Sequence, residues 1–382
     1  MNIIPYGRQN IDSHDIEAVS RILNSDFLTQ GPAVEEFENA FAKYIGSTFA
    51  IAVSNGTAAL HLCNLALDVN ENSNVITSPI TFAASANSVR YCNGNIFFAD
   101  IDPETLTLDP EKVVELIESK PKGFFQGIIP VDLAGYPVNL EAFRKIADKY
   151  GLWIIEDACH APGGWFTDSN NVQQNCGNGV YADLAIFSFH PVKHIACGEG
   201  GMVTTNDKAL YERIKMLRTH GITKDPQKMK RSDGGWYYEM QELGFNYRMP
   251  DILCALGTSQ LKKADEGIAK RKVIAKKYDD ELKHLNLELR SCPSDKGHAY
   301  HLYIIETNKR AELYEFLKQK GIYCQVHYIP VHKLPYYEEL YGEQHFINAE
   351  NYYNRGLSLP MYPGLSIDEQ DFVIQCIKDF YE

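Results

Sequence analysis

The sequence predicts an α/β fold in which a mainly parallel sheet carries helices on both faces. Three observations predict it. Short apolar stretches alternate with amphipathic helical patterns over the first two thirds of the chain. Helices of this length are the crossover connections that parallel strands need. The chain has 382 residues, which exceeds the usual size of a single domain, so a second and smaller unit is expected.

The elements follow in a regular order. An amphipathic helix is predicted over 11–23, and a polar loop with a Gly-Pro break over 24–34. The alternation then begins. Strands are predicted at 49–54, 74–79, 95–100, 125–135, 151–158, 183–190 and 200–206, and helices between them at 55–67, 81–92 and 140–150.

Near Pro250 the alternation of short apolar strands and helices gives way to a long charged helical pattern. One long charged helix is predicted over 251–285, and its length suits a bridge between domains. Four shorter segments follow it, at 299–307, 310–321, 323–330 and 368–382. We therefore expect a large domain over 1–260 and a smaller C-terminal α/β domain over 261–382.

Composition excludes several classes of protein. The net charge of -13 disfavours nucleic acid as a partner, because such binding depends on basic side chains. The nine cysteines are scattered and form no C-x-x-C pair, so neither a disulfide framework nor a metal site is indicated. No apolar run approaches the roughly 20 residues of a membrane span, and the N-terminus has no signal-peptide pattern. A cytoplasmic protein is expected.

Polar residues follow several predicted strands, at the sheet edge where ligands of α/β proteins gather. The stretch "SNGTAAL" (54–60) opens a helix with small residues, and such a start favours an anion or is simply a capped helix. "IIEDA" ends a buried strand with Glu156 and Asp157. That carboxylate pair is either structural or placed to pair with a cationic ring nitrogen.

Lys193 stands in the apolar, glycine-punctuated stretch "FSFHPVKHIACGEGG" (187–201). Such a lysine is a paired structural cation or an amine that traps a carbonyl, with Ser188 and His190 beside it. Burial would lower its pKa and favour the neutral nucleophile. An anion site, a carboxylate and an amine together match pyridoxal phosphate, which has a phosphate, a pyridine nitrogen and an aldehyde.

A series of motifs carries a family resemblance. They are "LTQGP" (28–32), "SNGTAALH" (54–61), "SPITFAASAN" (78–87), "IIEDACHA" (154–161), "FSFHPVKHIACGEGGMVTTND" (187–207), "LGFNYRMPDILCALG" (243–257), "QVHYIPVH" (325–332) and "LSLPMYPGL" (357–365). In this order they resemble, nearly end to end, the sugar-nucleotide aminotransferases of the DegT/DnrJ/EryC1/StrS group. That resemblance implies the fold-type I architecture of pyridoxal-phosphate transferases, similar to aspartate aminotransferase.

The resemblance also implies roles for individual residues. Lys193 would form an imine with the cofactor aldehyde, and Asp157 would pair with the ring nitrogen. Phe82 would stack on the ring, unless it is a core residue, and His160 would lie near the ring hydroxyl, unless it is structural. The phosphate-binding residues would be Gly56, Thr57, Ser188 and, from a neighbouring subunit, Asn246. A homodimer with a shared active site follows from the last assignment.

Within the group, the motifs look most like the branch that acts in pseudaminic acid synthesis. The expected reaction moves the amino group of L-glutamate to C4 of UDP-2-acetamido-2,6-dideoxy-β-L-arabino-hex-4-ulose. Its product would enter a surface polysaccharide or a modified flagellin. Substrate contacts would map to Tyr6, Asp26, Phe27, Leu28, Thr29, Val326, His327, Tyr328 and Ile329. Trp236 and Tyr237, in 231–242, would cover the sugar nucleotide or pack a dimer.

Other readings stay open. The acceptor could be another nucleotide-linked 4-keto sugar, of the bacillosamine, perosamine or dTDP-sugar type. A sugar dehydratase of the same group is disfavoured, because Lys193 is present and no cysteine cluster is available for an iron–sulfur centre. A non-catalytic protein that kept the fold is also disfavoured. Such a protein would be expected to lack some of the cofactor-binding residues, but Lys193, Asp157, Ser188 and Asn246 are all present. A nicotinamide dehydrogenase is excluded, because "GEGG" is not G-x-G-x-x-G and does not open the first helix.

Overall fold

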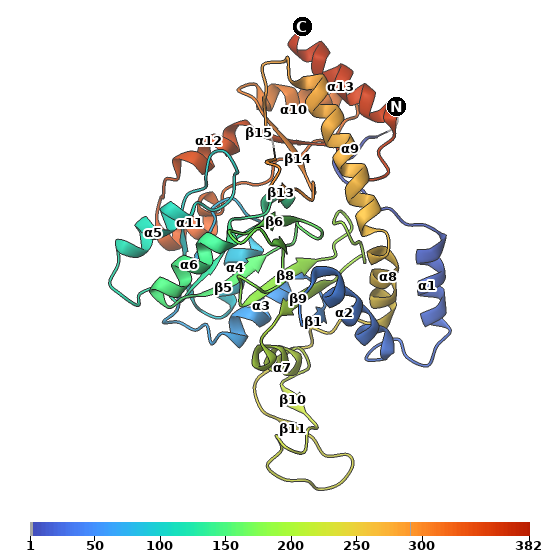
Figure 1. The fold of residues 1–382 in the computed structure, drawn as a ribbon, viewed down its shortest axis with the longest axis vertical. Helices are drawn as coiled ribbons and strands as arrows, with labels where there is room; N and C mark the ends of the chain where they lie inside the picture. Colours follow the sequence, from blue (N-terminus) through green and yellow to red (C-terminus); the bar gives the residue numbers. More distant parts are fainter. Residues whose placement is uncertain (1–2, 291) are drawn as a thin grey trace.

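The computed structural model describes residues 3–290 and 292–382 (Figure 1). Its centre is a seven-stranded sheet in the order β1-β9-β8-β5-β4-β2-β3. The strands are β1 (Phe49–Val53), β2 (Asn74–Thr77), β3 (Asn95–Phe98), β4 (Gly127–Ile129), β5 (Trp153–Asp157), β8 (Leu184–Ser188) and β9 (Gly201–Thr205). Only β9 runs antiparallel to its neighbours, β1 and β8, within this sheet. The predicted α/β class with a mainly parallel sheet is confirmed.

Side chains alternate between the two faces of the sheet, as a strand requires. In β1, Ile51 and Val53 pack with α3 (Gly56–Ala66), α4 (Ala84–Tyr91) and α7 (Lys208–Leu217). Ala50 and Ala52 point to the opposite face, where Phe37 and Phe41 of α2 (Pro32–Ile45) cover them. Both faces are therefore buried, which explains why the strands are short apolar runs.

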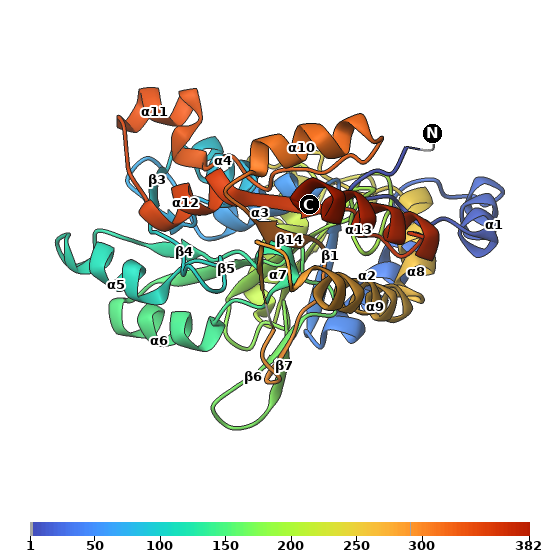
Figure 2. The same cartoon turned by 90° about the horizontal axis from the view of Figure 1, so that it is seen from above.

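The other helices cover the remaining parts of the sheet. α5 (Pro110–Glu118) and α6 (Leu140–Tyr150) pack on β4 and β5. α11 (Pro335–Tyr341) and α12 (Ile347–Arg355) come from the C-terminal part of the chain but also lie near the sheet, on the side of β3 and α4 (Figure 2). Tyr337 of α11, for example, donates a hydrogen bond to Asn87 of α4 over 2.7 Å.

The C-terminal region has a core of its own. Its sheet consists of β12 (Glu288–Leu289), β14 (Tyr303–Glu306) and β15 (Gly356–Leu359), and α9 (Ala264–Leu282), α10 (Arg310–Gln319) and α13 (Ile367–Tyr381) pack around it. The N-terminal segment joins this core, because Ile4 is buried there and pairs with Ile322. The Tyr6 carbonyl also accepts a hydrogen bond from Met361 over 2.9 Å.

Smaller elements complete the fold. β6 (Trp165–Thr167), β7 (Gln173–Asn175) and β13 (Lys296–Gly297) form a three-stranded sheet, and η1 (Leu133–Gly135) and η2 (Val331–Lys333) are single 3₁₀ turns. The hairpin β10 (Ile222–Thr223) and β11 (Glu239–Met240) projects from the body beyond α7, and Trp236 in its loop is 76% exposed (Figure 1). Among the described residues, no helix has both the length and the apolar composition needed to cross a membrane.

Three sequence predictions need correction. The strand expected over 125–135 is much shorter, because β4 spans only Gly127–Ile129 and the 3₁₀ turn η1 follows at Leu133–Gly135. The single long helix over 251–285 is wrong: α8 (Asp251–Leu261) and α9 are separate helices, and the chain turns at Lys263, whose φ of -112° and ψ of 10° leave the helical range. The predicted loop over 24–34 ends earlier than expected, because α2 already begins at Pro32. Proline suits the first turn of a helix, where its missing N–H has no partner to lose. α1 (Ser13–Leu23) matches its prediction.

Candidate active site

The site begins at the carboxyl end of β5, where Asp157 is buried with 5% of its surface exposed. Its Oδ2 accepts a hydrogen bond from the Ser85 hydroxyl of α4 over 2.7 Å, and its Oδ1 accepts one from the Cys159 N–H over 3.2 Å. A buried carboxylate needs such donors. Both fix the orientation of the carboxylate while leaving lone pairs for a further, cationic partner.

Lys193 lies in the loop that joins β8 to β9. This loop is pinched at its base, because the Phe189 N–H donates to the Gly200 carbonyl and the Cys197 N–H donates to the Phe189 carbonyl, each over 2.8 Å. Burial lowers the pKa of the Lys193 amine, and the nearby Cys159 thiol and Asp157 carboxylate oppose that shift. The amine is therefore closer to its neutral, nucleophilic form than an exposed lysine would be.

An anion-binding cup lies beside the lysine loop. α3 begins at Gly56 and is capped by Asn55, whose Oδ1 accepts from the Ala58 N–H over 2.8 Å. In the described part of the chain, the N–H groups of Gly56 and Thr57 find no acceptor. Ser188 adjoins them, since a Cβ on Gly56 would stand 3.1 Å from the Ser188 Cβ. Free amides at a helix start and a hydroxyl suit a phosphate.

Gly201 allows the lysine loop to approach this cup. A Cβ on Gly201 would stand 2.6 Å from the backbone carbon and oxygen of Asn55 and 2.8 Å from the Gly56 nitrogen. No other residue type fits without moving the backbone. The last glycine of the "GEGG" stretch therefore has a steric role, which is to let β9 pass directly beside the start of α3.

An aromatic side chain stands exposed at the same edge of the sheet. Phe82, which follows β2, is 62% exposed, and its ring centroid lies 6.0 Å from that of Tyr328. The alternative that Phe82 is a core residue is therefore wrong. Together, the cup, the Asp157 carboxylate, the Lys193 amine and an available aromatic face provide a receiver for each part of pyridoxal phosphate, so the residues present fit this cofactor.

Four histidines, 160, 194, 301 and 327, surround Lys193 and form what we call the imidazole group. The rings of His160 and His301 lie 4.3 Å apart, and those of His194 and His301 lie 5.6 Å apart. Burial lowers the pKa of every member, that of His327 to about 3, and the charge of Lys193 adds to the effect. The group is therefore neutral at neutral pH.

The hydrogen bonds of His160 define its tautomer. Its Nδ1 accepts from the Ala134 N–H over 3.2 Å, and a backbone amide can only donate. The proton of the neutral ring must therefore sit on Nε2, which lies 3.2 Å from the Tyr328 hydroxyl. Tyr328 accepts this bond, and its own O–H is free to donate into the site.

Two predicted substrate residues join this region. Tyr6 is half-buried, and its ring centroid lies 5.2 Å from that of His327. His327 is fixed through its Nδ1, which lies 2.9 Å from the Ser358 hydroxyl. The flanking residues differ in exposure, since Val326 is half-buried and Ile329 is 50% exposed.

The remaining predicted site residues are exposed. Residues 26–29 are exposed, and the Leu28 carbonyl accepts from the Asp251 N–H of α8 over 3.1 Å. Asn246 is exposed, and its side chain makes no hydrogen bond within the described residues. Between these two segments lies a cavity of about 360 Å³, bordered by Gln30, Gly31, Arg248 and Met249 among others.

A second acidic cluster lies behind Asp157 and is fully buried. The donor atoms of Asp132, Glu156 and Cys176 lie within 4.8 Å of one another. Burial and the charge of Asp132 raise the pKa of Glu156 well above its usual range, and burial raises that of Asp132 to about 6. A raised pKa favours the protonated form of Glu156, which is a poor metal ligand.

Several residues of the site escape the sequence motifs as interpreted above. Ser85, which orients Asp157, lies inside "SPITFAASAN" but has no distinguishing pattern there. His194 and His301 belong to the imidazole group, and the Ala134 N–H sets the tautomer of His160. These residues contact partners that are distant in the sequence, or act through a backbone N–H group. The spacing of residues within a motif therefore could not have revealed their roles.

Comparisons with known proteins agree with this geometry. The model of the DegT/DnrJ/EryC1/StrS aminotransferase family matches residues 9–378. The UDP-4-amino-4,6-dideoxy-N-acetyl-beta-L-altrosamine transaminase of Campylobacter jejuni is 37% identical over 97% of this chain and 96% of its own. The spore coat polysaccharide biosynthesis protein SpsC of Bacillus subtilis is 36% identical over 99% of this chain and 97% of its own.

A solved structure extends the similarity to three dimensions. Helicobacter pylori PseC, described as an aminotransferase involved in the biosynthesis of pseudoaminic acid, superposes with a TM-score of 0.87. It is 29% identical in sequence, and the match covers 100% of this chain and 99% of that one.

Proposed function

Because the chain belongs to the DegT/DnrJ/EryC1/StrS family of pyridoxal-phosphate-dependent sugar aminotransferases, we propose that it aminates C4 of a UDP-linked 4-keto-6-deoxy-N-acetylhexosamine. The acceptor would be UDP-2-acetamido-2,6-dideoxy-β-L-arabino-hex-4-ulose, and the amino donor L-glutamate. The observation that carries the proposal is the full-length similarity to a transaminase named for the altrosamine product of this reaction.

The proposed roles of the residues follow from their surroundings. When bound, the cofactor supplies an electron sink beside the carbon that loses its proton. Asp157, oriented by Ser85, would hold the ring nitrogen as a cation. Gly56, Thr57 and Ser188 would bind the phosphate. Lys193 Nζ, whose pKa is lowered by burial, would anchor the cofactor and then carry a proton to and from the substrate carbon as general base and acid.

His160 and Tyr328 would control protons at the edge of the ring. Because His160 accepts at Nδ1 and donates from Nε2, the imidazole is a fixed neutral donor to the Tyr328 hydroxyl. Phe82 would cover the open face of the ring. Tyr6 and His327 would contact the sugar, since their rings lie together and His327 is near enough to feel the charge of Lys193.

The proposed assembly is a homodimer whose two active sites are shared. Asn246 and residues 26–29 are exposed, and their sequence neighbours Gln30, Gly31, Arg248 and Met249 border one cavity. Both would therefore complete the site of a second copy, Asn246 at the phosphate and residues 26–29 at the sugar nucleotide. The nine cysteines are all free thiols, which supports a reducing, cytoplasmic setting for this dimer.

The test is a panel of UDP-, dTDP- and GDP-linked 4-keto sugars, each supplied with L-glutamate and the purified protein loaded with cofactor. The mass and stereochemistry of the product identify the reaction. We expect the UDP-linked L-arabino sugar to be aminated fastest, and we expect Lys193→Ala to abolish turnover, with the surface variant Lys270→Ala as its control. Turnover by Lys193→Ala, or release of water without any amino donor, would contradict the proposal.

A second acceptor class has its own support. The similarity to SpsC, a protein of spore coat polysaccharide biosynthesis, is as extensive as that to the altrosamine transaminase. Preferred amination of a D-configured or dTDP-linked 4-keto sugar in the panel would assign the chain an acceptor other than the L-arabino sugar. In either case the product would be an amino sugar destined for a surface polysaccharide or for modified flagellin.

A further inference from the structure

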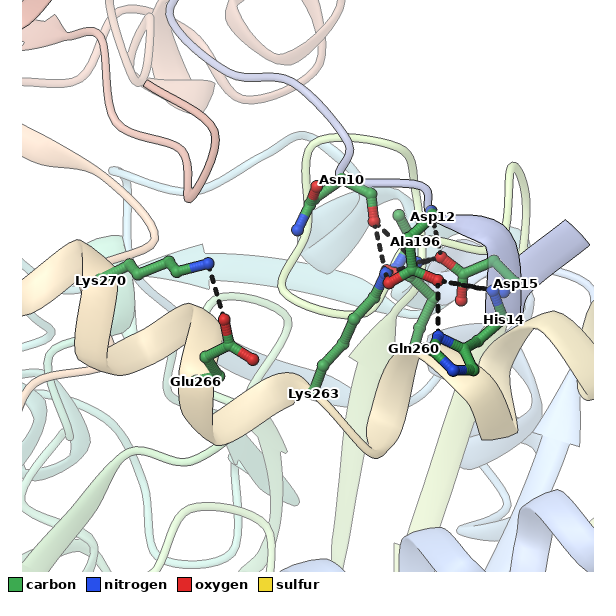
Figure 3. Close-up of polar contacts among 9 residues, drawn as sticks. All are labelled: Asn10, Asp12, His14, Asp15, Ala196, Gln260, Lys263, Glu266 and Lys270. Atoms are coloured by element: carbon green, nitrogen blue, oxygen red, sulfur yellow. Dashed lines mark hydrogen bonds and ion pairs between the residues drawn. The ribbon is translucent and has the colours of Figure 1, made fainter. Parts of the chain in front are cut away.

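The break between α8 and α9 places a lysine over the start of α1. Lys263 Nζ donates to the Asn10 carbonyl over 2.9 Å and to the carboxylates of Asp12 and Asp15, each over 2.6 Å (Figure 3). The Asp15 side chain is fully buried, so its charge depends on this partner. In a continuous helix, Lys263 would point in another direction. The turn between α8 and α9 therefore allows Lys263 to reach Asn10, Asp12 and Asp15.

Gln260, one turn earlier, ties the same segment to the lysine loop. Its Nε2 donates to the Asn10 carbonyl over 3.0 Å and to Asp15 Oδ2 over 2.7 Å. Its Oε1 accepts from the Ala196 N–H over 3.4 Å (Figure 3). Ala196 lies three residues after Lys193 in the sequence. The buried amide of Gln260 is thus a direct polar link between the N-terminal segment and the loop that carries Lys193.

The other end of α8 holds the far end of the same segment. Asp251 is fully buried, and its two carboxylate oxygens accept from the N–H groups of Gly31 and Ala33 over 2.9 and 3.1 Å. α8 therefore fixes the chain on both sides of α1. α1 itself buries only Asp15 and Ile22, so apolar packing contributes little to its position. The polar contacts of α8 decide where the residues flanking α1 lie.

We propose that Gln260 and Lys263 are positioning residues for the sugar-nucleotide acceptor, with Gln260 also setting the lysine loop. This rests on the proposed function, in which Tyr6 and residues 26–29 contact the acceptor. These contact residues flank α1 in the sequence, on its N-terminal and C-terminal sides, so the position of α1 constrains both, alongside the contact of the Tyr6 carbonyl with Met361. Neither Gln260 nor Lys263 needs to touch the substrate to act in this way.

The experiment compares Lys263→Met with Lys270→Met, which makes the same substitution about two turns further along α9. Among the described residues, Lys270 pairs with Glu266 alone, over 2.7 Å (Figure 3). In Lys263→Met we expect the KM for the acceptor to rise about tenfold, while the half-reaction with L-glutamate is unchanged. Lys270→Met should match the wild type, and Lys263→Arg should restore most of the lost affinity.

Gln260→Met tests the second part of the proposal, that Gln260 also sets the position of the lysine loop. It should raise the KM for the acceptor and also slow the half-reaction with L-glutamate, because it alone releases Ala196. Hydrogen exchange of the cofactor-free protein gives a readout independent of turnover: the amides of residues 11–31 should exchange faster in Lys263→Met, and those of 194–199 should change only in Gln260→Met.

The outcomes separate this inference from the substrate assignment. The assays use whichever acceptor the wild type aminates, so a different sugar changes the reagent and leaves the comparison intact. If no acceptor is aminated at all, the proposed function fails, and hydrogen exchange alone decides whether α8 holds the two segments. An unchanged acceptor KM in Lys263→Met, an equal loss in both half-reactions, or unchanged exchange at 11–31 would overturn the positioning role.

Discussion

At the scale of single residues, Ser85 is the contact that prepares Asp157. Its hydroxyl lies 2.7 Å from Asp157 Oδ2 and also 2.7 Å from the Thr81 hydroxyl, so its position is fixed. Ser85→Ala removes a donor to a buried carboxylate, and we expect a loss of about tenfold in the rate of the L-glutamate half-reaction. Stopped-flow absorbance of the bound cofactor measures it.

Ser88→Ala is the matched control for Ser85→Ala. Ser88 lies one turn further along α4, and its hydroxyl donates to the Ser85 carbonyl and accepts from Asn64 without reaching Asp157. It should leave the half-reaction unchanged. If both variants lose the same activity, Ser85 acts through the stability of α4 and has no particular effect on Asp157.

The buried pair of Asp132 and Glu156 predicts a pH-dependent cost to stability. Burial raises the pKa of Asp132 to about 6 in the folded protein, from 3.8. The unfolded chain therefore releases this proton first, and stability falls as pH rises from about 4 to about 6. Asp132→Asn cannot ionise but keeps an oxygen for the Val138 N–H. Its stability relative to wild type should increase by about 1–3 kcal/mol across this window.

Urea unfolding on the acid and alkaline sides of that window measures the difference between Asp132→Asn and wild type. Asp233→Asn, in the exposed hairpin loop, is the control and should show no such change with pH. A difference between Asp132→Asn and wild type that stays constant with pH would mean that Asp132 keeps one protonation state throughout.

The sequence predicted individual residues unevenly, for a physical reason. Lys193 and Asp157 stand out because a charged group next to apolar residues is costly and so must have a partner. Ser85, His194 and His301 are ordinary residue types in ordinary surroundings. Their importance depends on contacts across 70 or more residues, such as Ser85 with Asp157, which only the folded chain creates.

At the scale of elements, periodicity predicted the strands of the central sheet well, because both of their faces are buried and they are bounded by polar turns. The pattern failed at Lys263. Residues 262 and 263 are good helix formers, and nothing local interrupts the helix. At the break, the Asn10 carbonyl and the carboxylates of Asp12 and Asp15 accept hydrogen bonds from Lys263, and these contacts from outside the helix favour the turn.

The contact between β9 and α3 makes a further prediction at this scale. In Gly201→Ala, the new Cβ meets the backbone of Asn55 and Gly56 at 2.6 to 2.8 Å, so β9 or the start of α3 must move. Overpacking of this kind typically costs about 1–3 kcal/mol. Because the displaced amides belong to the phosphate cup, we also expect weaker binding of pyridoxal phosphate, measured by equilibrium dialysis.

Gly198→Ala separates the two effects of Gly201→Ala. Gly198 lies in the same loop at a φ of 84°, and a Cβ there would meet nothing within 4 Å. This variant should lose stability through backbone strain but bind the cofactor as the wild type does. Wild-type cofactor affinity in Gly201→Ala would show that the cup does not depend on this close approach.

At the scale of the whole molecule, the expected division at residue 260 stays a prediction. Ile4 is buried in the C-terminal core, and α11 and α12 lie against the N-terminal sheet, so chain segments cross between the two regions in both directions. Composition and periodicity report on local structure, and they carry no signal for such exchanges. The positions of Tyr6 and of the segment around His327 both depend on them.

The shared active site makes the last prediction, which concerns two copies of the chain. If Asn246 serves the site of its partner, Lys193→Ala and Asn246→Ala damage different sites in a mixed dimer. One site then receives both lesions, and the other combines an intact Lys193 from one chain with an intact Asn246 from the other. Mixing two nearly inactive homodimers after reversible dissociation should therefore regenerate activity, to about a quarter of the wild-type value if subunits exchange at random.

The control for this experiment mixes Lys193→Ala with Asp157→Asn. Both residues lie in the same site of the same chain, so every site in every mixed dimer carries one lesion, and no activity should return. Recovery with Asn246→Ala but not with Asp157→Asn would establish which residues cross between subunits. Equal failure of both mixtures, in samples shown by differential tagging to contain mixed dimers, would place Asn246 in the site of its own chain.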